Sequence, residues 1–350
     1  MLATAAAPAI DLRTTTPGDA PALTSFLGRV FEPEAVAGDR HMHWKYWSPR
    51  PDWAGSRSFV ACCRDGAIVA HAAAWPVHIR VDDQTVPAVH AVDWAADPAY
   101  PGAGIRVLRR IGAGVRMMIA TGGTAITRSI LPVVGFRAHG VVYAFARPVR
   151  PLRQTLTTGA RSPKLAGRLL RNALWRLTSP LTCPTGWSAV PMDPEDIPDA
   201  MWPRPSADTA VTARDAGICR YFVDSPSARH VLFGLARRGA LAGYFCLSFG
   251  RHVARIADLW LPSIDAEDWR AAFKTAASQA AREPDVCEVS AWASTALGAD
   301  GLRRAGFRPR DCSALTLFGD ARLLAGRTLH VQMLDCDASF LGGTGASYLT

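Results

Sequence analysis

Hydrophobic positions recur with two different spacings along residues 10–147, and each spacing predicts a different type of element. Every second position is apolar in several short runs, as expected for strands with one buried face. These runs predict strands at residues 10–15, 59–63, 67–79, 86–96, 124–127 and 141–146. Apolar residues three or four positions apart predict helices. This spacing predicts helices at residues 23–30, 39–47 and 105–120, with a short helical or irregular piece at 128–134.

The segment 97–110, with the sequence DPAYPGAGIRVLRR, joins the predicted strand 86–96 to the predicted helix 105–120. Gly102 and Gly104 permit a sharp bend and leave room for a close approach to the backbone. A helix that begins at such a turn presents unpaired N–H groups, and its dipole favours negative charge there. The segment is therefore predicted to hold a phosphate or pyrophosphate.

The same order of elements returns in the second part of the chain. The pattern there predicts strands at 230–236, 241–249, 253–261, 287–292 and 314–318, and helices at 213–222, 266–282 and 297–305. The run RDGAIVA at Arg64 resembles RRGALAG at Arg237, and VGFR at Val134 resembles AGFR at Ala305. Offsets of 173 and 171 residues between these pairs indicate a duplicated domain.

This duplication divides the chain into four predicted parts. An N-terminal domain spans residues 1–147, a basic and proline-rich connector 148–204, a second domain 205–326 and a C-terminal tail 327–350. The connector has a predicted helix at 165–177. The role of the tail is left open.

Composition agrees with an ordinary globular core, since 49% of the residues are apolar and 20% are charged. The sequence has no apolar run of 18 residues, so a membrane span is not expected. Eight cysteines are scattered without C-x-x-C spacing. They are interpreted as reduced core thiols, which predicts a cytoplasmic location and no metal site.

The net charge of +9 is concentrated in one segment, because residues 147–176 hold eight basic residues and no acidic one. Aromatic residues are nearly missing from this segment, so no nucleic-acid partner is predicted. Three interpretations stay open. The segment is a solvated connector, a peripheral contact with an anionic membrane surface, or a contact with a lipid-linked pyrophosphate substrate.

Together, the antiparallel strands, the glycine turn, the following helix and the later Gly135-Phe136 resemble the GCN5-related N-acetyltransferase (GNAT) superfamily. Asp97–Tyr100 resembles the V-x-P-x-[YF] motif of that family, and Pro101–Arg106 occupies its Q/R-x-x-G-x-G/A motif. The resemblance implies an α+β fold. Each of two tandem GNAT-like domains would have a mostly antiparallel central sheet flanked by helices.

The family binds acetyl-CoA at this turn, and the resemblance implies acetyl-CoA as cosubstrate and no metal. It places cofactor contacts at Trp94, Ala96, Gly102, Ala103, Gly104, Ile105 and Arg106. Two positions depart from the motif, since Pro101 stands first and Arg106 last. The corresponding turn after residue 261 has no glycine, so the second domain is predicted to be degenerate and not to bind CoA by this route.

The implied reaction is transfer of an acyl group to a small amine acceptor of the amino sugar or amino acid type. Asp93 is the candidate general base, and burial in an apolar strand is expected to raise its pKa. Tyr100 and Tyr143 are the candidate acids, since the stretch before Gly135 has no tyrosine. Two alternatives remain. The chain is a catalytically degenerate binding or scaffold protein, or a Fem-like aminoacyl transferase of envelope synthesis; oligomeric state is left open.

Overall fold

The structure, a computed structural model, describes residues 10–31, 38–158, 163–340 and 348–350. Its helices are α1 (Ala20–Val30), α2 (Asp39–Tyr46), α3 (Ala103–Gly112), α4 (Ala125–Val134), α5 (Pro151–Thr157), α6 (Pro163–Thr178), α7 (Ala216–Val223), α8 (Ala266–Ala280) and α9 (Ala296–Arg304). The strands of the first half are β1 (Asp11–Thr14), β2 (Ser58–Cys62), β3 (Ile68–Pro76), β4 (Ile79–Val81), β5 (Gln84–Val86), β6 (Ala88–Ala96), β7 (Met117–Thr121) and β8 (Arg137–Pro148). Those that follow are β9 (Trp187–Pro191), β10 (Thr209–Thr212), β11 (Arg229–Arg237), β12 (Ala240–Phe249), β13 (Val253–Trp260), β14 (Glu288–Ala293), β15 (Arg308–Gly319) and β16 (Thr328–His330).

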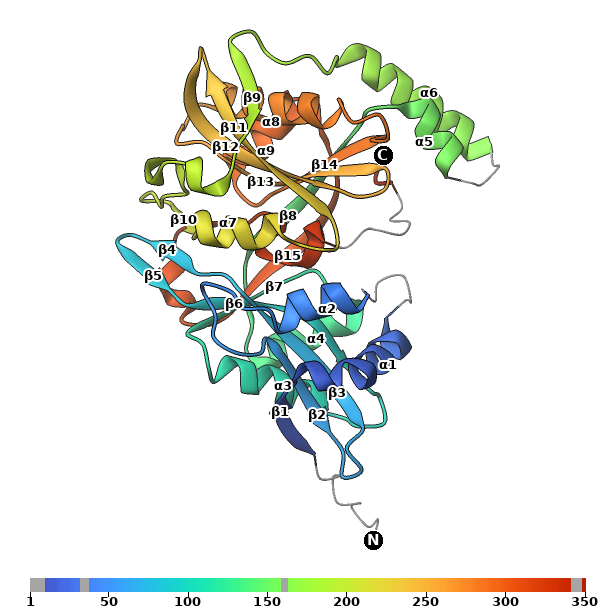
Figure 1. Ribbon diagram of the computed structural model, residues 1–350, viewed down its shortest axis with the longest axis vertical. Coiled ribbons are helices and arrows are strands. Elements are labelled where there is room, and N and C mark those ends of the chain that lie inside the picture. The colour runs from blue at the N-terminus through green and yellow to red at the C-terminus, as the bar shows by residue number, and fades with distance from the viewer. Residues whose placement is uncertain (1–9, 32–37, 159–162, 341–347) are drawn as a thin grey trace.

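One mixed sheet runs through the whole molecule. Its strands lie in the order β1-β2-β3-β6-β7-β15-β8-β14-β13-β12-β11-β9. Neighbouring strands are antiparallel except β6–β7 and β13–β14, which are parallel. The order is symmetric about the β15–β8 pair. The N-terminal half (β1 to β8) and the C-terminal half (β9 to β15) are stacked one above the other in Figure 1.

The two halves exchange their last strands. β15, from the C-terminal half, lies between β7 and β8, and β8 lies between β15 and β14. The predicted domain ranges 1–147 and 205–326 therefore share one sheet. Because each half completes the other, neither has an uninterrupted sheet of its own, and a cut at the predicted boundary would expose strand edges.

The predicted internal repeat corresponds to matching turns. Gly66 and Gly239 end the β2–β3 and β11–β12 turns with φ of 85° and 84°. Gly135 and Gly306 follow α4 and α9, also with positive φ. These left-handed conformations favour glycine, because a Cβ there meets the neighbouring carbonyl. The two short motifs therefore recur because both halves need the same backbone geometry at the same place.

Two predicted elements of the N-terminal half are wrong. The helix predicted at 105–120 ends at Gly112, and its last part is strand β7. The strand predicted at 124–127 is the first turn of α4, where the Thr124 side chain accepts a hydrogen bond from the N–H of Thr127 at 3.2 Å. A short apolar run such as Met117–Thr121 fits a buried strand as well as a helix.

A second, smaller sheet connects the halves, with strand order β16-β10-β4-β5. It explains why the predicted strands 67–79 and 86–96 are interrupted at Pro76 and Pro87, since the hairpin β4–β5 leaves the main sheet there. The segment after β16 continues through two short 3-10 turns, Met333–Asp335 and Asp337–Ser339, between the halves.

Three hydrophobic clusters hold the layers together. One lies between α3, α4 and the first half of the sheet, and a second between α8, α9 and the second half. The third combines α1 and α2 with α7 and the segment after β16, so it belongs to both halves. One face of the sheet is thus covered by α3 and α4 in the first half and by α8 and α9 in the second. The other face is covered by α1, α2 and α7, and their shared cluster packs the two halves against each other.

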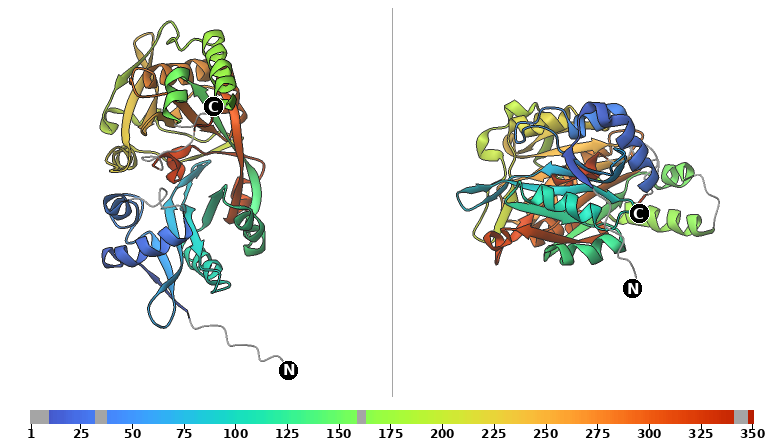
Figure 2. Two further views of the ribbon diagram at one scale, coloured as in Figure 1. Left: turned by 90° about the vertical axis from the view of Figure 1, so that its right-hand side faces the viewer. Right: turned by 90° about the horizontal axis from the view of Figure 1, so that it is seen from below.

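The connector forms α5 and α6 at the periphery of the molecule (Figures 1 and 2). The predicted helix 165–177 is confirmed within α6, whereas α5 was not predicted. Among the described helices, none is both long and apolar enough to cross a membrane. All eight cysteines are free thiols; five are buried, whereas Cys183 and Cys312 are exposed.

Candidate active site

The parallel strands β6 and β7 separate soon after they begin. They pair only through Ala88–His90 and Met117–Ile119 in the described structure. His90 marks the point of separation, where its Nε2 lies 2.9 Å from Thr121 Oγ1. Beyond it, residues of β6 are partly exposed although the strand is interior to the sheet; these are Ala91, Asp93, Trp94 and Ala96. The gap between the strands is therefore accessible from the surface.

A β-bulge on β6 shapes one wall of this gap. The register with β3 shifts between His71 and Ala73, so that β6 has one extra residue. Asp93 lies at the bulge and has a φ of 50°. This is a left-handed conformation that Asp and Asn tolerate better than other residues with a Cβ. His71 Nδ1 donates to the Asp93 carbonyl at 3.0 Å, and Ser58 Oγ lies 3.0 Å from His71 Nε2. The bulge is thus fixed by a side-chain hydrogen bond from His71 on β3, and Ser58 on β2 holds the His71 ring.

The helix α3 begins at the open end of the same gap. Its N-cap is Gly102, with a φ of 83° and no side chain that accepts a hydrogen bond from the first turn. The first turn contains no acidic residue. Such a terminus leaves N–H groups and the positive end of the helix dipole available to an anion. This geometry agrees with the phosphate site predicted from the sequence.

Close packing between α3 and β6 explains Gly104. A Cβ at this position would lie 2.9 Å from Trp94 Nε1 and 3.1 Å from the Cβ of Ala96. The Trp94 indole N–H donates to the Gly104 carbonyl at 2.9 Å. Trp94, Ala96 and Gly104 are therefore adjacent, as the predicted cofactor contacts require, and the glycine brings the helix end onto the strand.

The predicted cofactor contacts do not all lie in the gap. Ala103 is buried, and Ile105 packs against the same cluster as α3. The exposed Arg106 directs its Nη2 to the Ile10 carbonyl at 3.2 Å, beside β1. Because β1 is the outermost strand on the side away from β7, this guanidinium neither crowds the gap nor adds a cation to it.

Asp93 belongs to a cluster of charged residues on the α2 face of the sheet. Lys45 Nζ lies 2.6 Å from Asp93 Oδ2 and 2.9 Å from Asp337 Oδ2. The Tyr46 hydroxyl donates to Asp93 Oδ2 at 2.7 Å. Lys45 is only 4% exposed, whereas each carboxylate is 17% exposed. Two carboxylates and one ammonium leave an excess negative charge next to the gap.

The expected pKa of Asp93 is corrected by this cluster. Burial on its own would raise the pKa, but the Lys45 ammonium and the hydrogen bonds to the carboxylate outweigh it and lower the pKa to about 2. The same contacts raise the pKa of Lys45, and burial next to Asp93 raises the pKa of Tyr46. At neutral pH the cluster is thus ionised at Asp93 and Lys45, with a protonated tyrosine.

The candidate acids lie away from this carboxylate. Tyr100 makes its side-chain contact with Cys63, at the β2–β3 turn, and this contact raises the pKa of Tyr100. Tyr143 is on β8, opposite Ala293 and Cys312, three strands away from β6. At about 4.8 Å per strand, this separation is on the order of 14 Å. The structure therefore does not bring Asp93, Tyr100 and Tyr143 together.

Arg57 positions the end of α2 that carries Lys45. It is 1% exposed and donates to the carbonyls of Lys45 at 2.8 Å and Trp44 at 2.7 Å. These are terminal carbonyls that the helix itself leaves without partners. Trp44 in turn stacks on Tyr221 of α7 with ring centroids 4.7 Å apart. The charged cluster is thus held at the contact between the two halves.

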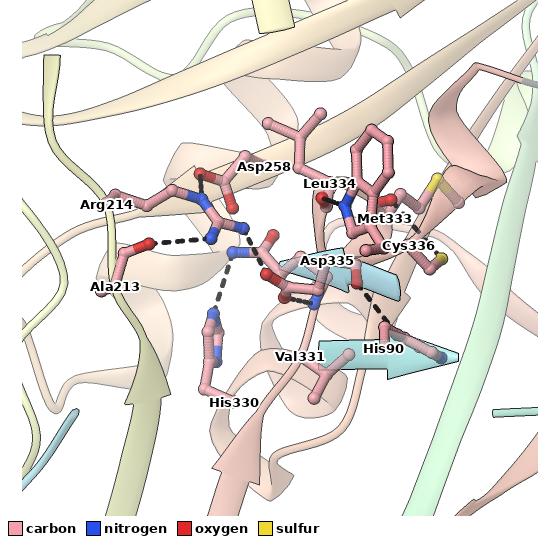
Figure 3. A network of polar contacts seen from close by, with 12 residues as sticks. His90, Ala213, Arg214, Asp258, His330, Val331, Met333, Leu334, Asp335 and Cys336 are labelled. Atoms are coloured by element: carbon pink, nitrogen blue, oxygen red, sulfur yellow. Dashed lines mark hydrogen bonds and ion pairs between the residues drawn. The ribbon is translucent and has the colours of Figure 1, made fainter. Parts of the chain in front are cut away.

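A second buried network lies at the corresponding place in the C-terminal half (Figure 3). Arg214 donates from Nε to Asp258 Oδ2 at 3.1 Å and from Nη2 to Asp335 Oδ1 at 2.6 Å. The Tyr244 hydroxyl donates to Asp258 at 2.8 Å, as Tyr46 does to Asp93. Figure 3 shows His90 directed at the Asp335 carbonyl, which links this network to β6 at 2.9 Å. Asp258 Oδ2 therefore accepts hydrogen bonds from both Arg214 and Tyr244.

The helix terminus in the C-terminal half differs from that of α3. The N-cap Asp265 accepts a hydrogen bond from the N–H of Glu267 at 2.9 Å, and the first turn contains Glu267 and Asp268. The Ser263 hydroxyl donates to Asp268 at 2.9 Å. This helix end has its own cap and carries negative charge, so it disfavours a phosphate.

No group of three or more metal-ligating side chains occurs among the described residues. Sequence reasoning missed Lys45, Tyr46 and Asp337 as neighbours of Asp93. A lysine before two aromatic residues in a predicted helix carries no signal of its own, and Asp337 is 244 positions from Asp93 in the sequence.

Comparison with known proteins finds similarity to one family model and to several solved structures. Residues 11–118 match the family described as acetyltransferase (GNAT) domain. No curated protein matches the chain in sequence. Among solved structures, it is similar to the N-myristoyltransferase of Saccharomyces cerevisiae with bound myristoyl-CoA, with a TM-score of 0.61 and 13% identity over 91% of this chain and 81% of that one.

Two further solved structures have the same arrangement. A tandem GNAT protein from the clavulanic acid biosynthesis pathway gives a TM-score of 0.54 at 14% identity, over 88% of this chain and 98% of that one. A GCN5-related N-acetyltransferase from Anabaena variabilis gives 0.53 at 13% identity, over 88% and 72%. At these identities the likeness extends to the fold.

Proposed function

We propose that this chain, a tandem GNAT-fold protein with a GNAT domain at residues 11–118, is an acyl-CoA-dependent N-acyltransferase. The observation that carries the proposal is the difference between the two helix ends. The gap beside β6 ends at α3, which has a glycine N-cap and no acidic residue in its first turn. The corresponding end of α8 has an aspartate cap and two further acidic residues. The N-terminal half is therefore the half that accepts the pyrophosphate of a CoA ester.

The residues that would hold the cosubstrate are those around the α3 terminus. The N–H groups of Gly104 and Ile105 would contact the phosphates, since the N–H of Ala103 already donates to the Tyr100 carbonyl at 3.1 Å. Trp94 and Ala96 would border the chain that enters the gap. Gly104 acts through packing against Trp94, and Arg106 is directed elsewhere. Acetyl-CoA is the first ligand to test. The likeness to a myristoyl-CoA-bound structure makes longer acyl chains the second.

The charged cluster supports an amine as acceptor. Asp93 and Asp337 carry two negative charges against the single charge of Lys45, and both carboxylates are partly exposed. A second cation, such as the ammonium of an amino sugar or amino acid, would be attracted to this place. With a pKa of about 2, Asp93 is too weak a base to accept the ammonium proton near neutral pH. We assign it the role of positioning the ammonium.

Calorimetry with acetyl-CoA and myristoyl-CoA tests the cofactor proposal. Gly102→Asp puts a carboxylate at the α3 terminus and should weaken binding by roughly fivefold or more, since like charges about 4 Å apart in water repel by ~1 kcal/mol. Gly239→Asp is the matched control, because Gly239 has the same positive φ and open space around it. Absence of binding of both esters at millimolar concentration would contradict the enzyme proposal and favour the scaffold alternative.

The acceptor proposal is tested with Asp93→Asn, which keeps a residue that tolerates the left-handed backbone. Release of the CoA thiol is followed with a panel of small amines. The variant should raise KM for the amine while the affinity for the CoA ester stays unchanged. An unchanged KM would remove Asp93 from the acceptor site.

A contact of the connector with an anionic membrane surface remains part of the proposal. Within 147–176, Arg147 and Arg150 turn inward and donate to backbone carbonyls. The α5–α6 hairpin nevertheless exposes leucines that are 53–77% accessible; these are Leu152, Leu156, Leu170, Leu174 and Leu177. Exposed leucines on basic helices are typical of interfacial segments.

Sedimentation with vesicles tests this contact. The chain should bind phosphatidylglycerol-containing vesicles and not pure phosphatidylcholine, and Leu174→Glu should weaken the binding. Val133→Glu, on the exposed face of α4, is the matched control. Equal binding of both vesicle types would argue against the charge-based contact.

A further inference from the structure

The C-terminal half has a large cavity where β13 and β14 separate. These strands pair only through Val253–Ile256 and Glu288–Ala291 in the described structure. Beyond them lies a cavity of about 870 Å³, within the range of small-molecule sites. Its apolar wall comes from four elements and consists of Trp260, Leu261, Pro262, Trp269, Leu297 and Leu324.

The cavity is unsuited to a CoA ester. It lies beside the start of α8, whose first turn is capped by Asp265 and holds two more acidic residues. Asp268 is further fixed by an ion pair with Arg237 at 3.0 Å. A pyrophosphate at this helix end would meet carboxylates and no unpaired N–H groups at the cap. The half thus keeps the gap between its parallel strands and lacks the anion site.

The charges around the cavity balance one another. Arg327 at the rim pairs with Asp82 at 2.8 Å, and the rim also contains one further cation, Arg204, and one carboxylate, Asp208. His139 and His330 are in the wall, and burial lowers the pKa of both, that of His330 to about 4. Both imidazoles are therefore neutral at pH 7, and an occupant gains nothing from carrying a net charge.

Aromatic rings dominate one side of the wall. Trp260 packs edge-on against Trp269, with centroids 6.0 Å apart, and against His330 at 5.4 Å. In the described structure the Trp260 indole nitrogen and His139 Nε2 are buried and have no hydrogen-bond partner. Neither nitrogen has accessible surface, so this side of the wall offers a ligand apolar contact with the rings.

From the neutral apolar wall and the aromatic rings around this volume, we propose that the cavity binds an uncharged, largely apolar small molecule. The site is separate from the CoA site assigned to the N-terminal half. It does not depend on that assignment, because its evidence comes from the residues around β13, β14 and β16.

Prodan, an uncharged naphthalene ketone whose emission shifts to the blue in apolar surroundings, is the probe. The full chain should bind one prodan with a blue shift, and saturating acetyl-CoA should not displace it. Ala296→Trp fills the cavity from the exposed first position of α9, and Ala325→Trp fills it from a second exposed lining position. Each should weaken prodan binding by tenfold or more. Val133→Trp, on the exposed face of α4, is the control and should bind like the unmodified chain.

Three results would overturn the proposal. Prodan does not bind the unmodified chain, or both filled variants bind it unchanged while folded, or acetyl-CoA displaces it competitively. Thermal unfolding of each variant shows whether it folds. Because the cavity is filled from two different positions, the test stays valid when one of the two variants does not fold. Failure of acetyl-CoA binding alone would contradict the enzyme proposal and leave this one standing.

Discussion

Replacing His71 by Asn should flatten the pH dependence of the free energy of unfolding between pH 7.5 and 5.5. His71 is fully buried and holds the β6 bulge through the Asp93 carbonyl. Burial lowers its pKa from 6.5 to about 4, despite the opposing charge of Asp93. The folded chain therefore keeps this imidazole neutral at a pH at which the unfolded chain has already protonated it.

The direction follows from which state binds more protons. Because the pKa is lower in the folded state, the stabilisation is present above pH 6.5 and is lost as the pH falls toward 4. With unfolded and folded pKa values of 6.5 and about 4, the loss between pH 7.5 and 5.5 is about 1.3 kcal/mol. Asn does not titrate, so the variant should lack this part of the loss.

Urea unfolding followed by tryptophan emission at both pH values measures the effect. The variant also loses side-chain hydrogen bonds, but that loss is the same at both pH values and cancels in the difference. His43→Asn on the exposed side of α2 is the control and should leave the pH dependence as it is. An equally steep pH dependence in His71→Asn would refute the argument that burial keeps His71 neutral.

Three further predictions concern packing, charge and thiol access. Gly104→Ala should lower the melting temperature, because its Cβ would lie 2.9 Å from Trp94 Nε1. Adding Trp94→Phe should recover part of the loss, and independent effects of the two substitutions in the double variant would exclude this contact. Arg214→Met leaves the two buried carboxylates of Asp258 and Asp335 without their cation. The free energy of unfolding, measured by urea titration, should fall by about 3–5 kcal/mol, and a loss below about 1 kcal/mol would contradict the ion pairs. Ellman's reagent should modify Cys183 and Cys312 in the folded chain, and the five buried thiols only after unfolding; rapid reaction of all would argue against the packing.

The sequence predicted the parts of the fold that depend on local chemistry. The glycine turn before α3, the turn at Gly66 and its repeat at Gly239 all need positive φ, and short motifs record that need. The end of the first long helix was not recognised. Gly112 and Gly114 weaken a helix there, but the apolar run that follows satisfies a helical pattern as well as a strand pattern.

The exchange of β8 and β15 could not be predicted from the pattern of residues. Both strands span 12 residues, and each comes after a helix and a glycine with positive φ, Gly135 or Gly306. The local sequence pattern of such a strand is the same whether the strand pairs within its own half or with strands of the other half. Pairing depends on register and on neighbours distant in sequence, which one sequence does not reveal.

The candidate site also combines a part built from residues close in sequence with a part built from distant ones. Its proposed cofactor side is local, since Trp94, Gly102 and Gly104 lie within 11 residues, so the sequence alone could suggest it. Its acceptor side is assembled by Lys45 and Asp337, which are 292 residues apart. The contact of Lys45 with Asp93 reverses the expected shift of the Asp93 pKa, because the buried ammonium at 2.6 Å and the hydrogen bonds to the carboxylate outweigh the effect of burial.

Duplication left two gaps between parallel strands, and the residues at each helix end now determine what each gap can hold. In both halves a tyrosine and a cation contact an aspartate of the strand before the parallel gap, with Tyr46 and Lys45 on Asp93, and Tyr244 and Arg214 on Asp258. Asp93 is 17% exposed, whereas Asp258 is 2% exposed. The less accessible charge of Asp258 and the acidic cap of α8 both disfavour a charged ligand in the C-terminal half. The C-terminal half therefore offers a neutral pocket beside β13 and β14, and the acyl transfer proposed for this chain is assigned to the N-terminal half.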